Sequence, residues 1–115
     1  MIKIEEFYQL EAWKKSHQLT ILIYKITKSF PKEERYSLID QLRRAASSVG
    51  ANIAEGFGRY HFADKVKFYY QARGSLKEVQ NFIFLARDLG YISTEKSEEI
   101  FKEIRSCEML VNGII

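Results

Sequence analysis

The side chains best suited to acid–base chemistry in this 115-residue sequence are two glutamates and two histidines. Glu55 and Glu78 each lie on the polar side of a predicted helix, so one carboxyl group could donate a proton while the other accepts one. Such a hydrolase would need both glutamates in one pocket, with at least one raised carboxyl pKa. His17 and His61 stand apart from them and are expected to be exposed. Because no nucleophile with a base and an orienting group is evident, we predict a protein that is not an enzyme.

Metal and cofactor sites need sets of ligands that the sequence lacks. A carboxylate-bridged metal site in a helical bundle uses Glu-x-x-His pairs, but the residues three before the histidines are Lys14 and Gly58. The single cysteine, Cys107, excludes a cysteine-cluster zinc site, and its apolar neighbours at helical spacing predict a buried, inert thiol. There is no phosphate-binding glycine loop. We therefore predict no metal and no cofactor.

The strongest signal for binding is a concentration of basic and aromatic residues around a predicted turn. Basic groups neutralise phosphates, and aromatic side chains stack on unpaired bases. The adjacent arginines of the preceding helix add a second basic pair, although the formal net charge of the chain is only +3. The alternative is a solvated turn whose aromatic residues cover the core. The predicted nucleic-acid contacts are Arg43, Arg44, Arg59, Tyr60, His61, Lys65 and Lys67.

A second polar group follows the helices themselves. One stripe consists of Arg44, Ser48, Asn52, Glu55 and Arg59, at steps of four, four, three and four, and Ser75 and Glu78 lie one turn apart on the next helix. Such residues can face solvent, form hydrogen bonds within the bundle or between subunits, or contact a ligand. We interpret Asn52, Glu55, Ser75 and Glu78 as structural.

Hydrophobic spacing assigns these residues to four helices. Apolar side chains recur at steps of three and four over residues 12–30, 39–56, 62–89 and from about 94 to 114. Pro31 ends the first helix, and small residues over 45–54 allow close approach of a neighbouring helix. Gly56, Gly58 and Gly90 suit helix ends, where a left-handed residue is common, and Ser93 or Thr94 can cap the last helix.

The third predicted helix has the most regular stripe. Its strict rhythm is Phe68, Ala72, Ser75, Val79, Phe82, Ala86 and Leu89, which Tyr69, Leu76 and Ile83 widen. Connections of about two to six residues favour antiparallel packing of sequential helices. We predict one all-α domain over residues 1–115, an antiparallel up-down-up-down four-helix bundle.

Apolar residues beyond these stripes predict self-association. The chain has eight Phe, seven Tyr and one Trp. Among them Tyr24, Tyr70, Phe84 and Phe101 fall off the stripes, and residues 109–115 are almost entirely apolar. Because exposed apolar patches usually mark interfaces, we expect a homo-oligomer. No long apolar run or signal peptide is present, so we expect no membrane association and a cytoplasmic location.

The segment DQLRRAASSVGANIAEG, residues 40–56, resembles the signature of the 23S rRNA-intervening sequence proteins, also called S23 ribosomal proteins. The resemblance extends to Trp13, residues 30–31, Tyr36, Arg59, Phe68, and residues 72–78 and 89–91. Ser37-Leu38 departs from a common Gly-Leu pair at the start of the second helix.

This resemblance implies a bacterial four-helix bundle that assembles as a homopentamer. The fold is similar to that of the accessory variability proteins of diversity-generating retroelements, which bind nucleic acid and a reverse transcriptase. The activity of the resembled family itself is unassigned. Our leading hypothesis is a non-enzymatic homo-oligomer that binds RNA or DNA through a repeated basic surface. The alternative is a scaffold for a protein partner, such as an accessory subunit of a polymerase or a ribonucleoprotein enzyme.

Overall fold

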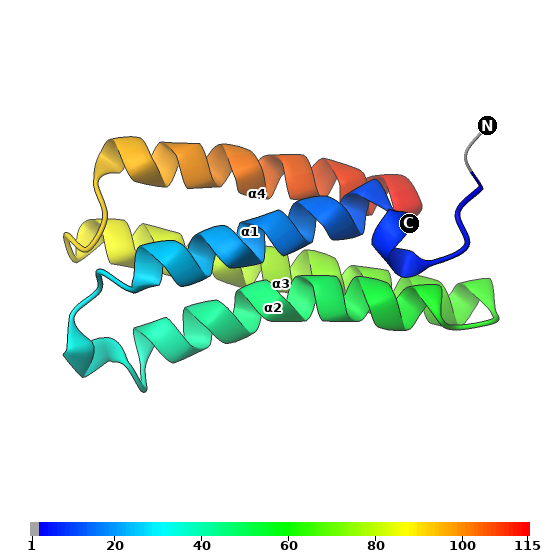
Figure 1. Ribbon diagram of the computed structural model, residues 1–115, viewed down its shortest axis with the longest axis horizontal. Helices are drawn as coiled ribbons and strands as arrows, with labels where there is room; N and C mark the ends of the chain where they lie inside the picture. The colour runs from blue at the N-terminus through cyan, green and yellow to red at the C-terminus, as the bar shows by residue number, and fades with distance from the viewer. Residues whose placement is uncertain (1–2) are drawn as a thin grey trace.

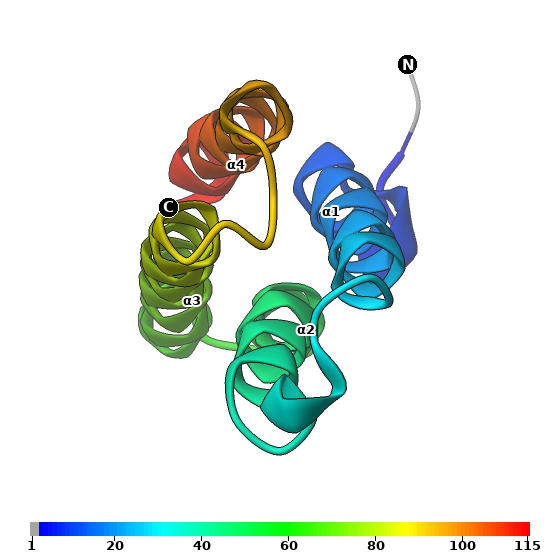
Figure 2. The same ribbon diagram turned by 90° about the vertical axis from the view of Figure 1, so that its left-hand side faces the viewer.

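The computed structural model describes residues 3–115, which form four long helices without a strand (Figure 1). These are α1 (Glu11–Thr27), α2 (Leu38–Phe57), α3 (Phe62–Asp88) and α4 (Thr94–Ile114); two short 3-10 turns, η1 (Phe7–Gln9) and η2 (Lys32–Glu34), precede α1 and α2. Viewed end on, the helices surround one core (Figure 2). The predicted all-α four-helix bundle is confirmed.

The direction of the helices decides which connections share an end of the bundle. The α1–α2 and α3–α4 connections lie at one end, and the α2–α3 connection and the C-terminus lie at the other (Figure 1). The buried side chains of α1 show which side of this helix faces the core. They recur at steps of four and three: Ala12, Ser16, Leu19, Ile23 and Thr27. That spacing places all of them on one face of a helix.

In α3 the centre of the buried face differs from the predicted one. Leu76 and Ile83, expected to widen the stripe, are completely buried. Phe68 and Phe82 are only half-buried, and Leu89 is 49% exposed. Ala72, Val79 and Ala86 of the predicted rhythm are also completely buried. The buried face of α3 is therefore centred between these residues and Leu76 and Ile83, and Phe68 and Phe82 lie at its edges. Leu89 also lies just beyond the last helical residue, Asp88.

The glycines at the helix ends do not all act as predicted. Gly90 has a φ of +79° and terminates α3 in the expected left-handed conformation. Gly58 terminates α2 with a right-handed φ of −74°, so the expected left-handed cap is wrong there. Gly56 lies inside α2, where a Cβ atom would come within 2.7 Å of the Tyr69 ring. The cap of α4 is confirmed, because the Ser93 hydroxyl accepts a hydrogen bond from the Lys96 N–H at 3.0 Å.

Small residues of α2 permit the close approach of α1, as predicted. A Cβ atom on Gly50 would lie 3.3 Å from Nε1 of Trp13. One helical turn away, the Thr20 hydroxyl donates to the Ala46 carbonyl at 3.0 Å. Trp13 itself stacks on the exposed His17 ring, with centroids 4.6 Å apart. The cost of glycine in a helix is therefore offset by contacts that a larger residue would prevent.

The apolar residues expected outside the core divide into two groups. Tyr24, Tyr70 and Phe84 are exposed, and Met109 is 72% exposed. Phe101 is buried, so its predicted exposure is wrong. It follows the buried Ile100 in α4, and its ring packs against the Phe84 ring, with centroids 4.5 Å apart. None of the helices in residues 3–115 has the length and apolar character needed to cross a membrane.

Cys107 is completely buried, as predicted, and its burial raises the pKa of the thiol to about 11. A hydrogen bond with Ser16 and the charge of Lys15 oppose this increase. Because the folded protein keeps the thiol protonated, the thiol stabilises the fold below its ordinary pKa near 9, and this contribution is lost as the pH rises through about 11.

We expect the free energy of unfolding to fall by about 2–3 kcal/mol more in the natural protein than in Cys107→Ala between pH 8.5 and 11. Urea unfolding at a series of pH values measures this difference. Parallel pH profiles for the two proteins would show that the thiol titrates equally in the folded and unfolded states.

Candidate nucleic-acid interface

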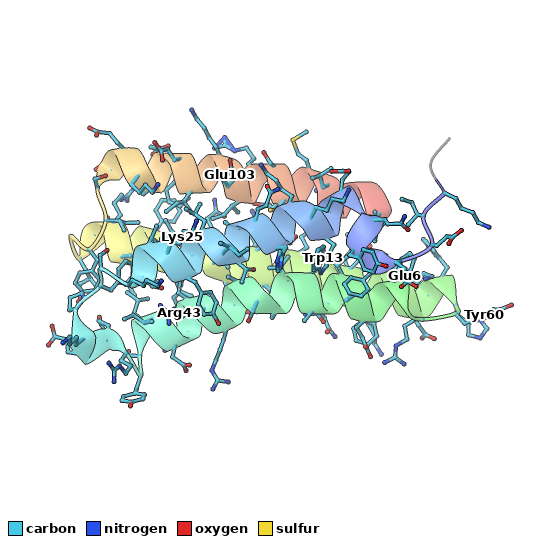
Figure 3. All side chains as sticks on the ribbon, in the orientation of Figure 1. Glu6, Trp13, Lys25, Arg43, Tyr60 and Glu103 are labelled. Atoms are coloured by element: carbon cyan, nitrogen blue, oxygen red, sulfur yellow. The ribbon has the colours of Figure 1, made fainter. Side chains whose placement is uncertain are left out.

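Two aromatic side chains project from the α2–α3 end of the bundle. Tyr60 is 91% exposed and Phe62 is 65% exposed. Tyr60 extends beyond the last turn of the helices (Figure 3), and its ring meets His61 edge-on, with centroids 5.1 Å apart. His61 holds the start of α3, because its carbonyl accepts hydrogen bonds from the N–H groups of Asp64 and Lys65 at 3.1 Å. The turn thus exposes two aromatic rings, next to a backbone that is hydrogen bonded to the first turn of α3.

The cations around this turn have different surroundings. Arg59 donates to the Glu55 carboxylate at 2.6 Å, and its guanidinium lies 4.7 Å from the centre of the Phe68 ring. Lys65 donates to the Phe57 carbonyl at 2.7 Å and thereby caps the C-terminus of α2, where a positive charge is favourable. Lys67 is exposed, and no carboxylate among residues 3–115 lies within ion-pair distance of it. Lys67 is therefore the cation of this turn that is most available to a ligand.

Arg43 and Arg44 lie far from the turn. From Arg43, α2 continues to Phe57, which is about 21 Å at the rise of an α-helix, and Arg59 lies two residues beyond that end. Arg43 and Tyr60 are well separated in Figure 3. Arg43 contacts α1, whereas Arg44 forms an exposed ion pair with Asp40 at 2.9 Å. Within one protomer, the structure divides the predicted contact residues between two places.

Polar residues between α2 and α3 form internal hydrogen bonds. The hydroxyl groups of Ser48 and Ser75 bond to each other and join the two helices, and the Asn52 amide donates to the Ser48 carbonyl at 2.9 Å. Asn52 and Ser75 thus each take part in a hydrogen bond within the bundle.

The two glutamates are not assembled into a catalytic pair. Glu78 lines a cavity of about 290 Å³ with Ser48 and Phe82, but Glu55 does not line it and is paired with Arg59. Ser48 and Ser75 mark a point where the antiparallel helices α2 and α3 are in contact. Glu55 follows Ser48 and Glu78 follows Ser75, so the two glutamates lie in opposite directions from this point, about 15 Å apart along the bundle axis. The hypothesis of a hydrolase that uses both carboxyl groups is therefore not supported.

At the opposite end of the bundle, Arg43 is joined by three cations that the sequence analysis did not single out. Lys28, Lys32, Arg35 and Arg43 line a cavity of about 230 Å³ where α1 connects to α2. The four cations are scattered over 16 positions of the sequence and do not form a compact basic cluster like the one at the α2–α3 turn. The signal that could have revealed them is the proline between them, since a chain reversal after α1 brings the two flanks together.

Comparison with known proteins gives a consistent picture. The family described as 23S rRNA-intervening sequence protein matches residues 8–113. The chain is also similar in structure to a protein of unknown function from the S23 ribosomal protein family of Bacteroides thetaiotaomicron VPI-5482, solved at 1.70 Å resolution. The TM-score is 0.82 at 24% sequence identity, over 90% of this chain and 93% of that one. No curated protein matches.

Proposed function

The chain belongs to the 23S rRNA-intervening sequence protein family, and from this premise we propose that it is a non-enzymatic homopentamer that binds RNA at the α2–α3 end of each subunit. The observation that carries the proposal is the exposure of Tyr60 and Phe62 beside the cations of the turn. A folded protein gains nothing by holding large aromatic rings in water, whereas unpaired bases stack on them. A bacterial cytoplasm, where RNA is abundant, is the compartment that this function requires.

The side chains of the turn would have distinct roles. Tyr60, with His61 beside it, would stack on a base, and Lys67 would contact a phosphate. Arg59 could exchange its Glu55 partner for a phosphate, because both are anions and the pair is open to solvent. Lys65 would contribute charge while remaining hydrogen bonded to the end of α2. Arg44 would contact a strand that continues along α2.

Self-association is supported by apolar residues on the outside of the bundle. Tyr70, Phe84, Leu85 and Met109 are large, apolar and exposed. Such a surface is unfavourable on a free monomer and usually lies in an interface. Five copies would repeat the turn five times around a ring, so weak contacts at each turn would add in avidity.

We expect a fluorescently labelled single-stranded RNA to bind in 50 mM salt and to dissociate as the salt concentration rises. Tyr60→Ala should weaken binding by about 5- to 150-fold, the loss of one stacked base. Lys67→Gln should reduce the salt slope by about one for each subunit that contacts the RNA. Fluorescence anisotropy over a salt series measures both effects, and light scattering gives the mass of the assembly with and without RNA.

The matched controls are Tyr36→Ala and Lys102→Gln. Tyr36 is equally exposed but lies at the other end of the bundle, and Lys102 is exposed on α4. Equal losses in the turn variants and in these controls would indicate unspecific attraction and would overturn the proposed site. Absence of binding in low salt would overturn RNA binding altogether.

A scaffold for a protein partner is the second candidate. Ile21 and Tyr24 of α1, Leu85 of α3 and Leu89 just after α3 are exposed apolar residues that a partner could cover. Apolar association persists in moderate salt, where contacts to phosphates weaken. A stable assembly that ignores RNA in the scattering experiment would favour this function.

A further inference from the structure

The cavity at the α1–α2 end combines a small volume with an unusual concentration of positive charge. Its volume is about 230 Å³, and its walls come from the end of α1, the η2 turn and the start of α2. Its charged lining residues are Lys28, Lys32, Arg35 and Arg43, without any carboxylate. The remaining walls include the buried Phe30 and Thr27. A site of this composition selects anions.

Arg43 is held in place before any ligand arrives. Its Nε donates to the Thr27 hydroxyl at 2.8 Å, and one terminal nitrogen donates to the Tyr24 carbonyl at 3.3 Å. The guanidinium also lies over the Tyr24 ring, 4.6 Å from its centre. The Thr27 hydroxyl donates its own proton to the Ile23 carbonyl at 2.7 Å, so its oxygen is oriented to accept from Arg43. Because a guanidinium has five N–H donors, three remain for an anion.

The other cations lack carboxylate partners within the part of the chain that the structure describes. No ion pair forms at Lys28, Lys32 or Arg35, although Glu34 and Asp40 lie close in the sequence. The Glu34 carboxylate accepts from the Tyr91 hydroxyl at 3.0 Å, and Asp40 is paired with Arg44. Glu34 and Asp40 thus have other partners, whereas Glu33 is exposed and forms no ion pair with these cations within residues 3–115. The positive charges around the cavity repel one another.

The carbonyl groups at the C-terminal end of α1 are not available as hydrogen-bond acceptors for these cations. The carbonyls of Lys25, Ile26 and Thr27 accept hydrogen bonds from the N–H groups of residues 28, 29 and 30, at 3.1–3.3 Å. These three carbonyls are therefore engaged, and the donors of the cationic side chains remain available. An anion with several oxygens would satisfy them.

We propose that this cavity binds the terminal phosphate monoester of a nucleotide. A monoester has about two negative charges and three free oxygens, which suit several cations and the remaining donors of Arg43. The cavity is smaller than the roughly 300–1,000 Å³ of sites for larger organic ligands, so it would hold the phosphate while the nucleoside remains outside. The phosphate can belong to a free nucleotide or to the 5′ end of an RNA. This proposal is independent of the proposed function, which concerns the opposite end of the bundle.

Calorimetric titration of the full chain with uridine 5′-monophosphate, inorganic phosphate and uridine tests the proposal. We expect both phosphates to bind in 50 mM chloride and uridine to show no heat. Lys32→Gln/Arg35→Gln should weaken phosphate binding by at least about tenfold, because each charged hydrogen bond is worth roughly that factor. Both residues are exposed, so the double variant is expected to fold.

The matched control is Lys102→Gln/Arg105→Gln, which removes the same residue types at the same spacing from the exposed surface of α4. This control should bind phosphate as the natural protein does. Equal weakening in the two double variants would show only general attraction to a basic protein and would overturn the proposal. So would the absence of phosphate binding by the natural protein.

Two RNA oligonucleotides of one sequence, with a 5′-phosphate or a 5′-hydroxyl, distinguish the sources of the phosphate. The measurement uses Tyr60→Ala, so that the turn at the other end contributes little. Tighter binding of the phosphorylated RNA than of uridine monophosphate, lost in Lys32→Gln/Arg35→Gln, would identify an RNA end. Equal affinity for the free nucleotide and the phosphorylated RNA would identify a nucleotide site. Equal binding of the two oligonucleotides, together with no binding of uridine monophosphate, would overturn the proposal.

Discussion

Ile83→Ala is expected to lower the free energy of unfolding by about 2–5 kcal/mol, the range for removing a large aliphatic side chain from a packed core. Ile83 is completely buried in α3. Its removal would lose the transfer free energy of three carbon atoms and leave a cavity that the neighbouring helices can close only in part. Urea unfolding followed by circular dichroism measures the change.

Leu89→Ala is the control. It removes the same number of carbon atoms, from a residue that the sequence pattern also places on the apolar stripe of the third helix. Leu89 is 49% exposed, so we expect a loss below about 1 kcal/mol. An effect at Leu89 as large as that at Ile83 would mean that α3 packs with the other edge of its apolar stripe inward. It would contradict the burial of the α3 side chains described above.

Gly56→Ala is expected to destabilise the fold by about 1–3 kcal/mol, although alanine is the better helix former. The added Cβ atom would lie 2.7 Å from Cε1 of Tyr69 and 3.1 Å from the carbonyl oxygen of Lys65. Tyr69 is buried, and the carbonyl belongs to the backbone of α3, so α2 and α3 must move apart. Because Gly56 lies next to the α2–α3 turn, RNA binding should also weaken.

Gly74→Ala tests the same substitution where space is open. Gly74 lies inside α3, and apart from its chain neighbours and the backbone of its own helix nothing lies within 4 Å of the position of its Cβ. There we expect alanine to stabilise the fold by about 0.5–1 kcal/mol through helix propensity and a less flexible unfolded chain. Thermal or urea unfolding of both variants gives the comparison. Stabilisation by both would show that α2 and α3 do not approach as closely at Gly56 as the structure indicates.

Helix content, helix order and antiparallel packing could all be predicted from the sequence. The reason is that periods of three and four, the cap at Ser93 and the stop after Asp88 depend on neighbours within a few residues. The small residues around Gly50 could be assigned to close packing for the same reason. The burial of Cys107 also followed from its place in a regular stripe.

The candidate sites depended on contacts between helices, which no local pattern specifies. Lys65 resembles Lys67 in the sequence, but the reversal at residues 58–61 brings it back to the Phe57 carbonyl at the end of α2. Arg43 lies near the start of α2 and Arg59 lies just beyond its last residue, so the length of the helix separates them, and Arg43 donates to Thr27 of α1 instead.

The residue pattern of this protein therefore determined the number, order and approximate bounds of its helices, because helix formation and capping are local. Tertiary packing decided which edge of α3 is buried, that Glu55 and Glu78 are kept apart, and that Lys28, Lys32, Arg35 and Arg43 surround one cavity. Those outcomes depend on the rotation and axial position of each helix against its neighbours, and the packing of side chains across the whole core sets both.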